Sequence, residues 1–142
     1  MDLVSLTIDG VQVQVPAGTT VLEAARLANI QIPTLCYLKD VNQIGACRMC
    51  LVDTGARAFA AACVMPVSPN VVVKTNTPAI REARKVNMEL LLSNHDRKCL
   101  TCVRSRNCEL QTLAEELGVR DVRFAGKRNE YPIADSSPSV VR

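Results

Sequence analysis

The feature that most constrains this chain is the position of its seven cysteines and its single histidine, which all fall into two short runs. The first run is Cys36, Cys47, Cys50 and Cys63, and the second is His95, Cys99, Cys102 and Cys108. Thiolate and imidazole groups at such spacings are typical ligands of metal centres that prefer sulfur and nitrogen. The pattern therefore predicts two metal sites with four ligands each.

Composition makes a structural role for these metals plausible on physical grounds. The chain has 142 residues, enough for one ordinary domain or two small ones, and contains two Phe, two Tyr and no Trp. Its core must come from aliphatic side chains, which bury less area each than aromatic ones. Because small domains often need a metal to supplement burial, we expect metal loss to unfold much of the protein.

The cellular setting follows from what the sequence lacks. No stretch approaches the roughly twenty apolar residues that cross a membrane, and the start MDLVSLTIDG has neither the basic nor the apolar part of a signal peptide. An odd number of cysteines with two C-x-x-C pairs argues against a disulfide scaffold. We expect a cytoplasmic protein with no direct membrane insertion.

Local patterns predict the order of secondary structure. Alternation over residues 3–8 and 11–15 around Asp9-Gly10 predicts a hairpin, and Thr20 with Glu23 forms a capping box ahead of a short helix. Short apolar runs at 51–52, 59–62 and 71–74 predict further strands.

A second helix is expected to begin at Thr77-Pro78 and to run to about residue 92, and a third to span 109–117 and stop at Gly118. The predicted class is α+β. The predicted domains are a small mixed α+β domain over residues 1–76, a helical segment over 77–118 and a connector over 119–142.

The first ligand run favours a two-iron cluster over zinc or a redox-active dithiol. Cys47-Arg-Met-Cys50 alone fits all three, but a lone cysteine on each side removes the symmetry of a four-cysteine zinc ribbon. Gly45 would let the loop fold closely over cluster sulfur. Arg48 and Met49 are expected to point outward and to cover the cluster where a partner docks.

The second run, His95-x3-Cys99-x2-Cys102-x5-Cys108, follows one predicted helix and precedes another. Its residues could hold zinc in a closed tetrahedral site. A histidine at a helix end is ordinarily a solvated cap. Three cysteines within the next thirteen residues favour its being a ligand instead.

Four segments in this order, PTLC, GACRMCLV, AACVMPV and LLLSNHDRKCLTCVRSRNCELQTLAEELG, resemble the N-terminal iron-sulfur region of the iron-only ([FeFe]) hydrogenase large subunit. The resemblance covers residues 3–142. The same module opens the large iron-sulfur subunit of NADH:quinone oxidoreductase and of some NAD-dependent formate dehydrogenases.

The resemblance implies a β-grasp, ferredoxin-like domain whose [2Fe-2S] cluster is held by Cys36, Cys47, Cys50 and Cys63. It also implies a small helical segment whose [4Fe-4S] cluster is held by His95, Cys99, Cys102 and Cys108. Such a protein would relay electrons between flavin- and NAD(P)-binding subunits and a catalytic subunit. The hydrogenase type is the preferred interpretation, and the formate dehydrogenase and respiratory types are the alternatives. A histidine ligand should raise the reduction potential of the second cluster.

Charge and missing motifs limit the alternatives. The formal net charge of +3 is offset by clusters carrying about −2 and −1 with their ligands, so the loaded protein is nearly neutral. Basic residues gather at Arg81, Arg84 and Lys85 and at Arg97, Lys98, Arg104 and Arg106. Without aromatic residues between them they do not favour nucleic acid; solvated surface is expected, with docking to an acidic flavoprotein as the lesser alternative.

No nucleotide-binding or hydrolase motif occurs, and the later four-iron motifs and catalytic domain of the family are not in this sequence. Glu115 and Glu116 diverge by about 100° on a helix and are expected to be solvated. Substrate-converting residues are therefore expected elsewhere. The opposing hypothesis is a structural zinc module.

Overall fold

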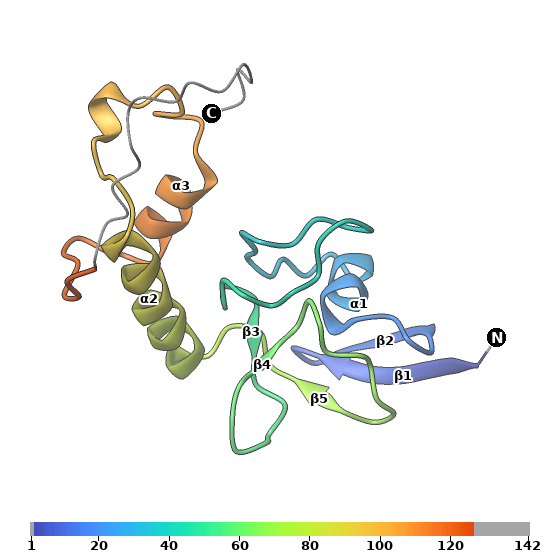
Figure 1. The fold of residues 1–142 in the computed structure, drawn as a ribbon. Helices are drawn as coiled ribbons and strands as arrows, with labels where there is room; N and C mark the ends of the chain where they lie inside the picture. The colour runs from blue at the N-terminus through green and yellow to red at the C-terminus, as the bar shows by residue number, and fades with distance from the viewer. Residues whose placement is uncertain (1, 127–142) are drawn as a thin grey trace.

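A computed structural model describes residues 2–126 as two adjoining lobes, a sheet lobe (residues 2–76) and a helical lobe (residues 77–126), which Figure 1 shows side by side. The strands are β1 (Leu3–Ile8), β2 (Val11–Pro16), β3 (Leu51–Val52), β4 (Ala60–Ala61) and β5 (Val72–Val73). The helices are α1 (Val21–Leu27), α2 (Pro78–Ser93), the 3₁₀ turn η1 (Cys99–Thr101) and α3 (Glu109–Glu116). This arrangement confirms the predicted α+β class.

The N-terminal hairpin forms as its turn residues predict. Asp9 and Gly10 both have positive φ, 48° and 86°, as a tight two-residue hairpin turn requires. β1 pairs antiparallel with β2 along its whole length and parallel with β5 on its other edge, giving the order β2-β1-β5. The long segment between β2 and β5 must therefore bring the chain back to the free edge of β1.

Helix α1 covers this sheet and encloses the main core. Thr20 caps the helix by accepting a hydrogen bond from the Glu23 N–H at 3.3 Å. The carboxylate of Glu23 takes a bond from the hydroxyl of Tyr37 rather than returning to the cap, so only half of the predicted capping box forms. Val21, Leu22, Ala24 and Ala25 are buried against strand residues such as Leu6 and Ile8.

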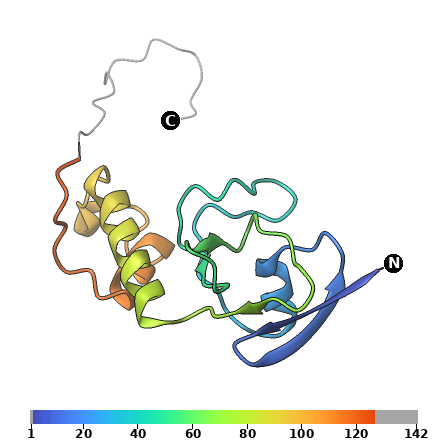
Figure 2. The ribbon, with the colours of Figure 1, turned by 90° about the horizontal axis from the view of Figure 1, so that it is seen from below.

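A second apolar core joins the two lobes. It contains Cys47, Met49 and Met88, all buried, packed by side chains from α2, α3 and the loop before Cys36. α2 starts as predicted, with Thr77 accepting from the Ile80 N–H at 3.2 Å and Pro78 in the first turn. Figure 2 shows α2 and α3 packed together beyond the sheet lobe.

Residues 119–126, which the sequence placed in the connector, return along α2. Arg123 donates two hydrogen bonds, 2.7 and 3.0 Å long, to the buried carboxylate of Glu89. A Cβ on Gly126 would stand 2.4 Å from the carbonyl oxygen of Ser93, so only glycine allows this approach. The rest of the predicted connector, 127–142, lies outside the described residues, and the predicted domain boundaries stay a prediction.

No helix within residues 2–126 is both long enough and apolar enough to cross a membrane.

Candidate metal centres

The hairpin of β3 and β4 positions two cysteines of the first run. Cys50 immediately precedes β3 and Cys63 follows β4 by two residues, and the Ala62 N–H donates to the Cys50 carbonyl at 3.0 Å. Both cysteines are buried, with 1% and 0% of their surface exposed. They also interact, because Cys50 is one of the causes that raise the pKa of Cys63.

The other two cysteines of this run meet across the loop that precedes the hairpin. The backbone N–H of Cys47 points at Sγ of Cys36, with 3.5 Å between nitrogen and sulfur. Arg48 has a φ of 57°, and this left-handed turn lets the chain reverse between Cys47 and Cys50. Cys36 is also close enough to Cys63 for their charges to interact. The fold therefore brings all four cysteines of the first run together.

Burial acts to raise the pKa values of three of these thiols, and nearby backbone N–H groups act to lower them. Burial raises the pKa of Cys47, and it is the main cause that raises the pKa of Cys63 to about 12, followed by the neighbouring Cys50. Burial also opposes ionisation of Cys36, yet N–H groups of Cys47 and Ala46 lower its pKa. Since thiolate is the form that binds metal, metal binding at this site must release protons.

Gly45 behaves as its place in the sequence indicates. Its φ is +63°, and an added Cβ would lie 3.3 Å from a methyl group of Val64. Its backbone N–H is near enough to Cys63 to lower the pKa of that thiol. The glycine therefore lets the loop approach a predicted ligand closely.

These features fit a [2Fe-2S] cluster. Three of the four thiols are buried, and the backbone N–H of Cys47 faces the sulfur of Cys36, as cluster sulfur prefers. Among the described residues, no three His, Cys, Asp or Glu side chains form a single-ion site. The assignment of each cysteine as a ligand stays a prediction.

The expectation for Arg48 and Met49 is wrong for Met49. Arg48 is exposed beside the first site, but Met49 has no exposed surface and packs with Met88 of α2. Arg48 thus faces solvent, and Met49 faces the helical lobe. Of these two residues, only Arg48 is available to a partner.

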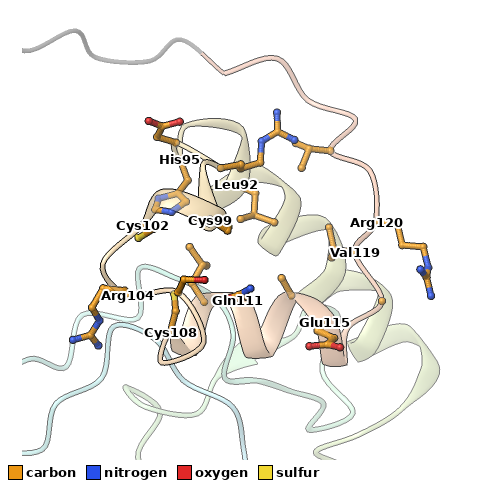
Figure 3. Close-up of a pocket in the computed structure, with 17 residues that line it drawn as sticks. Leu92, His95, Cys99, Cys102, Arg104, Cys108, Gln111, Glu115, Val119 and Arg120 are labelled. Carbon is orange, nitrogen blue, oxygen red and sulfur yellow. The ribbon is translucent and has the colours of Figure 1, made fainter.

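The second run surrounds an open cavity of about 430 Å³ in the helical lobe. His95 follows the C-terminus of α2, Cys99 begins the turn η1, Cys102 follows it, and Cys108 precedes α3. In Figure 3, His95, Cys99 and Cys102 lie on one side of the cavity and Cys108 on the other. The structure therefore also brings together all four predicted residues of the second run.

The second site is far more open than the first. His95 and Cys102 are exposed, and Cys99 and Cys108 are half-buried. Cys108 stands at the N-cap of α3, but its thiol makes no capping bond and stays available as a ligand. Three thiols and one imidazole around a cavity of this size fit a [4Fe-4S] cluster, which can take such a mixed ligand set.

The basic residues of α2 do not share one solvated face as expected. Arg81 is exposed, whereas Arg84 is only 4% exposed and reaches the carbonyl of Leu51, next to Cys50. The sequence did carry a signal for this burial, because Arg84 lies four residues from both Ile80 and Met88 on one apolar stripe. Glu115 and Glu116 are exposed, as predicted.

A small mixed sheet, a helix across it and a loop with four converging cysteines define a ferredoxin-like iron-sulfur protein. In agreement, residues 1–78 match the family described as the 2Fe-2S iron-sulfur cluster binding domain, and the chain belongs to this family. Residues 84–123 match the NADH-ubiquinone oxidoreductase-G iron-sulfur binding region. The two matches confirm the predicted [2Fe-2S] and [4Fe-4S] cofactors.

Curated relatives place the same two regions in larger proteins. The chain is 43% identical, over 100% of its length, to the NADP-reducing hydrogenase subunit HndD of Solidesulfovibrio fructosivorans, of which it covers 25%. It is 38% identical, over 98% of its length, to the mitochondrial NADH dehydrogenase [ubiquinone] iron-sulfur protein 1 of Solanum tuberosum, of which it covers 19%. The chain therefore spans a quarter or less of these relatives.

A solved structure shares the whole described fold. A chain in the crystal structure of an NAD+-reducing [NiFe]-hydrogenase in the H2-reduced state superposes with a TM-score of 0.85 at 30% sequence identity. The match covers 95% of this chain and 57% of that one. The predicted resemblance to iron-sulfur subunits of hydrogenases and NADH-linked oxidoreductases is thus confirmed.

Proposed function

We propose that this chain is the electron-relay region of a multi-subunit oxidoreductase of the hydrogenase type. In this role it passes single electrons between a flavin- and NAD(P)-binding partner and a catalytic centre outside this sequence. Bound in the two sites, the clusters would supply one-electron redox chemistry. Cys36, Cys47, Cys50 and Cys63 would hold the first cluster and His95, Cys99, Cys102 and Cys108 the second.

One observation supports the relay above all others, the apolar core shared by the lobes. Cys47 of the first site lies in that core with Met49 and Met88, while Leu92 and Leu110, which line the second cavity, pack against it. Close-packed interiors deform little. The chain's own residues thus hold the two sites at a fixed separation.

The relatives support the hydrogenase branch, because the 43% identical relative is a subunit of an NADP-reducing hydrogenase. The respiratory branch is the second candidate, since two NADH-quinone oxidoreductase subunits are 38% and 41% identical. A [NiFe]-hydrogenase chain shares the fold. The fold by itself therefore favours no particular type of hydrogen-activating centre.

The test is anaerobic iron and acid-labile sulfide analysis together with electron paramagnetic resonance during stepwise reduction. We expect about six irons per chain and two distinct reduced-state signals. The variants Cys50→Ser and Cys102→Ser should each remove one signal and leave the other. A colourless protein with two bound zinc ions that iron and sulfide do not reconstitute would refute the relay.

The branch is tested with the complete complex that contains this chain. Rapid mixing with NADPH or NADH should reduce both clusters only when the flavin-binding subunit is present. Hydrogen should reduce them in a hydrogenase and have no effect in a respiratory enzyme. Reduction by NADH that passes to a quinone, with no response to hydrogen, would favour the second candidate.

A further inference from the structure

Arg84 is the one arginine among residues 2–126 that the fold buries, with 4% of its surface exposed. It projects from α2 into the sheet lobe. Its Nη2 donates to the Leu51 carbonyl at 2.7 Å and to the Thr75 carbonyl at 2.9 Å. Its buried Nε has no hydrogen-bond partner in the described part of the chain.

No carboxylate neutralises this guanidinium directly. Within residues 2–126 Arg84 takes part in no ion pair, and the carboxylate whose charge acts on it is that of Asp9. Asp9 bonds to the N–H of Thr75 at 2.8 Å, so it is separated from Arg84 by Thr75. Asp9 is itself exposed to solvent, which weakens its field.

The other negative group near Arg84 belongs to the first metal site. Burial lowers the pKa of Arg84, and the charge of Cys50 opposes that shift ahead of the charge of Asp9. Leu51, whose carbonyl Arg84 binds, is the next residue after Cys50. Burying a cation without a counter-charge is costly. A two-iron cluster with four thiolates carries about −2 and would provide that counter-charge.

We propose that Arg84 is a built-in counter-charge of the first site that raises the reduction potential of its cluster. The inference rests on that site holding the [2Fe-2S] cluster. When one electron enters from a reductant and no proton is taken up, the site becomes one unit more negative. A buried positive charge stabilises the reduced form more than the oxidised form. Arg84 thereby acts as a positioning and tuning residue, supplied by the helical lobe to a site in the sheet lobe.

The experiment is a redox titration of the iron-loaded protein, followed by the electron paramagnetic resonance signal of the reduced first cluster. Arg84→Gln keeps a polar amide and removes the charge. We expect it to lower the equilibrium constant for reduction by tenfold or more, about 59 mV per factor of ten for one electron. Arg84→Lys keeps the charge and should stay within about threefold of the wild type.

The matched control is Arg81→Gln, three residues earlier on the same helix and exposed to solvent. Solvent screens its charge, so the potential should stay unchanged. If Arg84 only anchored the helix, Arg84→Gln and Arg84→Lys would both lower stability and neither would shift the potential. An unshifted potential in Arg84→Gln with a full iron content overturns the proposal.

A second variant decides the matter if Arg84→Gln fails to hold iron. Arg84→Met also removes the charge, and its apolar side chain can occupy the buried position without needing hydrogen-bond partners. The potential should fall as in Arg84→Gln. An unchanged potential with a full iron content would overturn the proposal. Wild-type protein without any iron would instead refute the proposed function.

Discussion

The two metal sites differ in how much of their shape the protein provides. In the first, Cys50 and Cys63 are buried, and sheet, hairpin and α1 surround the ligand loop. In the second, His95 and Cys102 are exposed, and the neighbouring Leu100 and Val103 are almost wholly exposed, at 100% and 99%. Packing of the sheet lobe thus fixes the shape of the first site. The segment between α2 and α3, which carries most of the second site, makes few contacts that hold it in place.

The largest difference should appear when one ligand of each site is removed. Cys102→Ser should abolish the second-cluster signal and loosen residues 94–108, yet leave the unfolding transition of the sheet lobe almost unchanged. Cys63→Ser should abolish the first-cluster signal and also destabilise that lobe, because its side chain lies at 0% exposure in the core. Paramagnetic resonance and thermal unfolding by circular dichroism measure both effects. Equal destabilisation by the two variants would contradict the comparison.

Met49 tests whether the two sites are mechanically joined. Met49→Ala should lower the free energy of unfolding by about 2–5 kcal/mol, since it leaves a cavity in the core between the lobes. Leu100→Ala is the matched control, and its fully exposed side chain should contribute less than about 0.5 kcal/mol. Urea unfolding of the iron-loaded protein measures both. A cost for Met49→Ala as small as that of the control would show that the lobes are not coupled there.

The attachment of residues 119–126 to α2 should depend on pH. The hydrogen bonds from Arg123 lower the pKa of Glu89 below its usual value. A lowered carboxyl pKa gives stabilisation that is present above the ordinary pKa of about 4.3 and is lost as the pH falls through the lower, folded-state value. The protection factors for hydrogen exchange at residues 119–126, which correct for the intrinsic pH dependence of exchange, should therefore fall in acid.

Glu89→Gln should show those low protection factors already at neutral pH, with little further change on acidification. Glu116→Gln, which replaces an exposed carboxyl on α3, is the control and should be protected like the wild type. A wild-type segment whose protection factors stay constant across this pH range would rule out Glu89 as its anchor.

Arg48 should give the smallest effect, confined to partner encounter. It is exposed on the loop of the first site, so Arg48→Glu should leave stability unchanged within about 0.5 kcal/mol. It should alter the rate of electron transfer with the partner several-fold, and more at low salt. Arg57→Glu, exposed in the loop between β3 and β4, serves as control. Identical rates and salt dependence for both variants would remove Arg48 from the docking surface.

Local signals predicted much of the fold, and contacts distant in sequence account for the rest. The Asp9-Gly10 turn, the caps at Thr20 and Thr77 and the stop at Gly118 act within a few residues, and all occur where expected. The two runs of predicted ligands each converge, as their spacing indicates. The burial of Met49 and Arg84 was missed, because it depends on how α2 packs on a loop more than thirty residues earlier.

The parallel pairing of β1 with β5 carries a consequence for biosynthesis. Thr7 lies opposite Val72, and all four cysteines of the first run fall between these partners. During synthesis from the N-terminus the sheet can close as soon as residue 73 is free of the ribosome, while the second run of predicted ligands is still inside the exit tunnel. We expect the first iron site to become ready for loading while the helical lobe is still being translated. Met49 would then stay exposed to solvent until α2 packs against the loop and Met88 covers it.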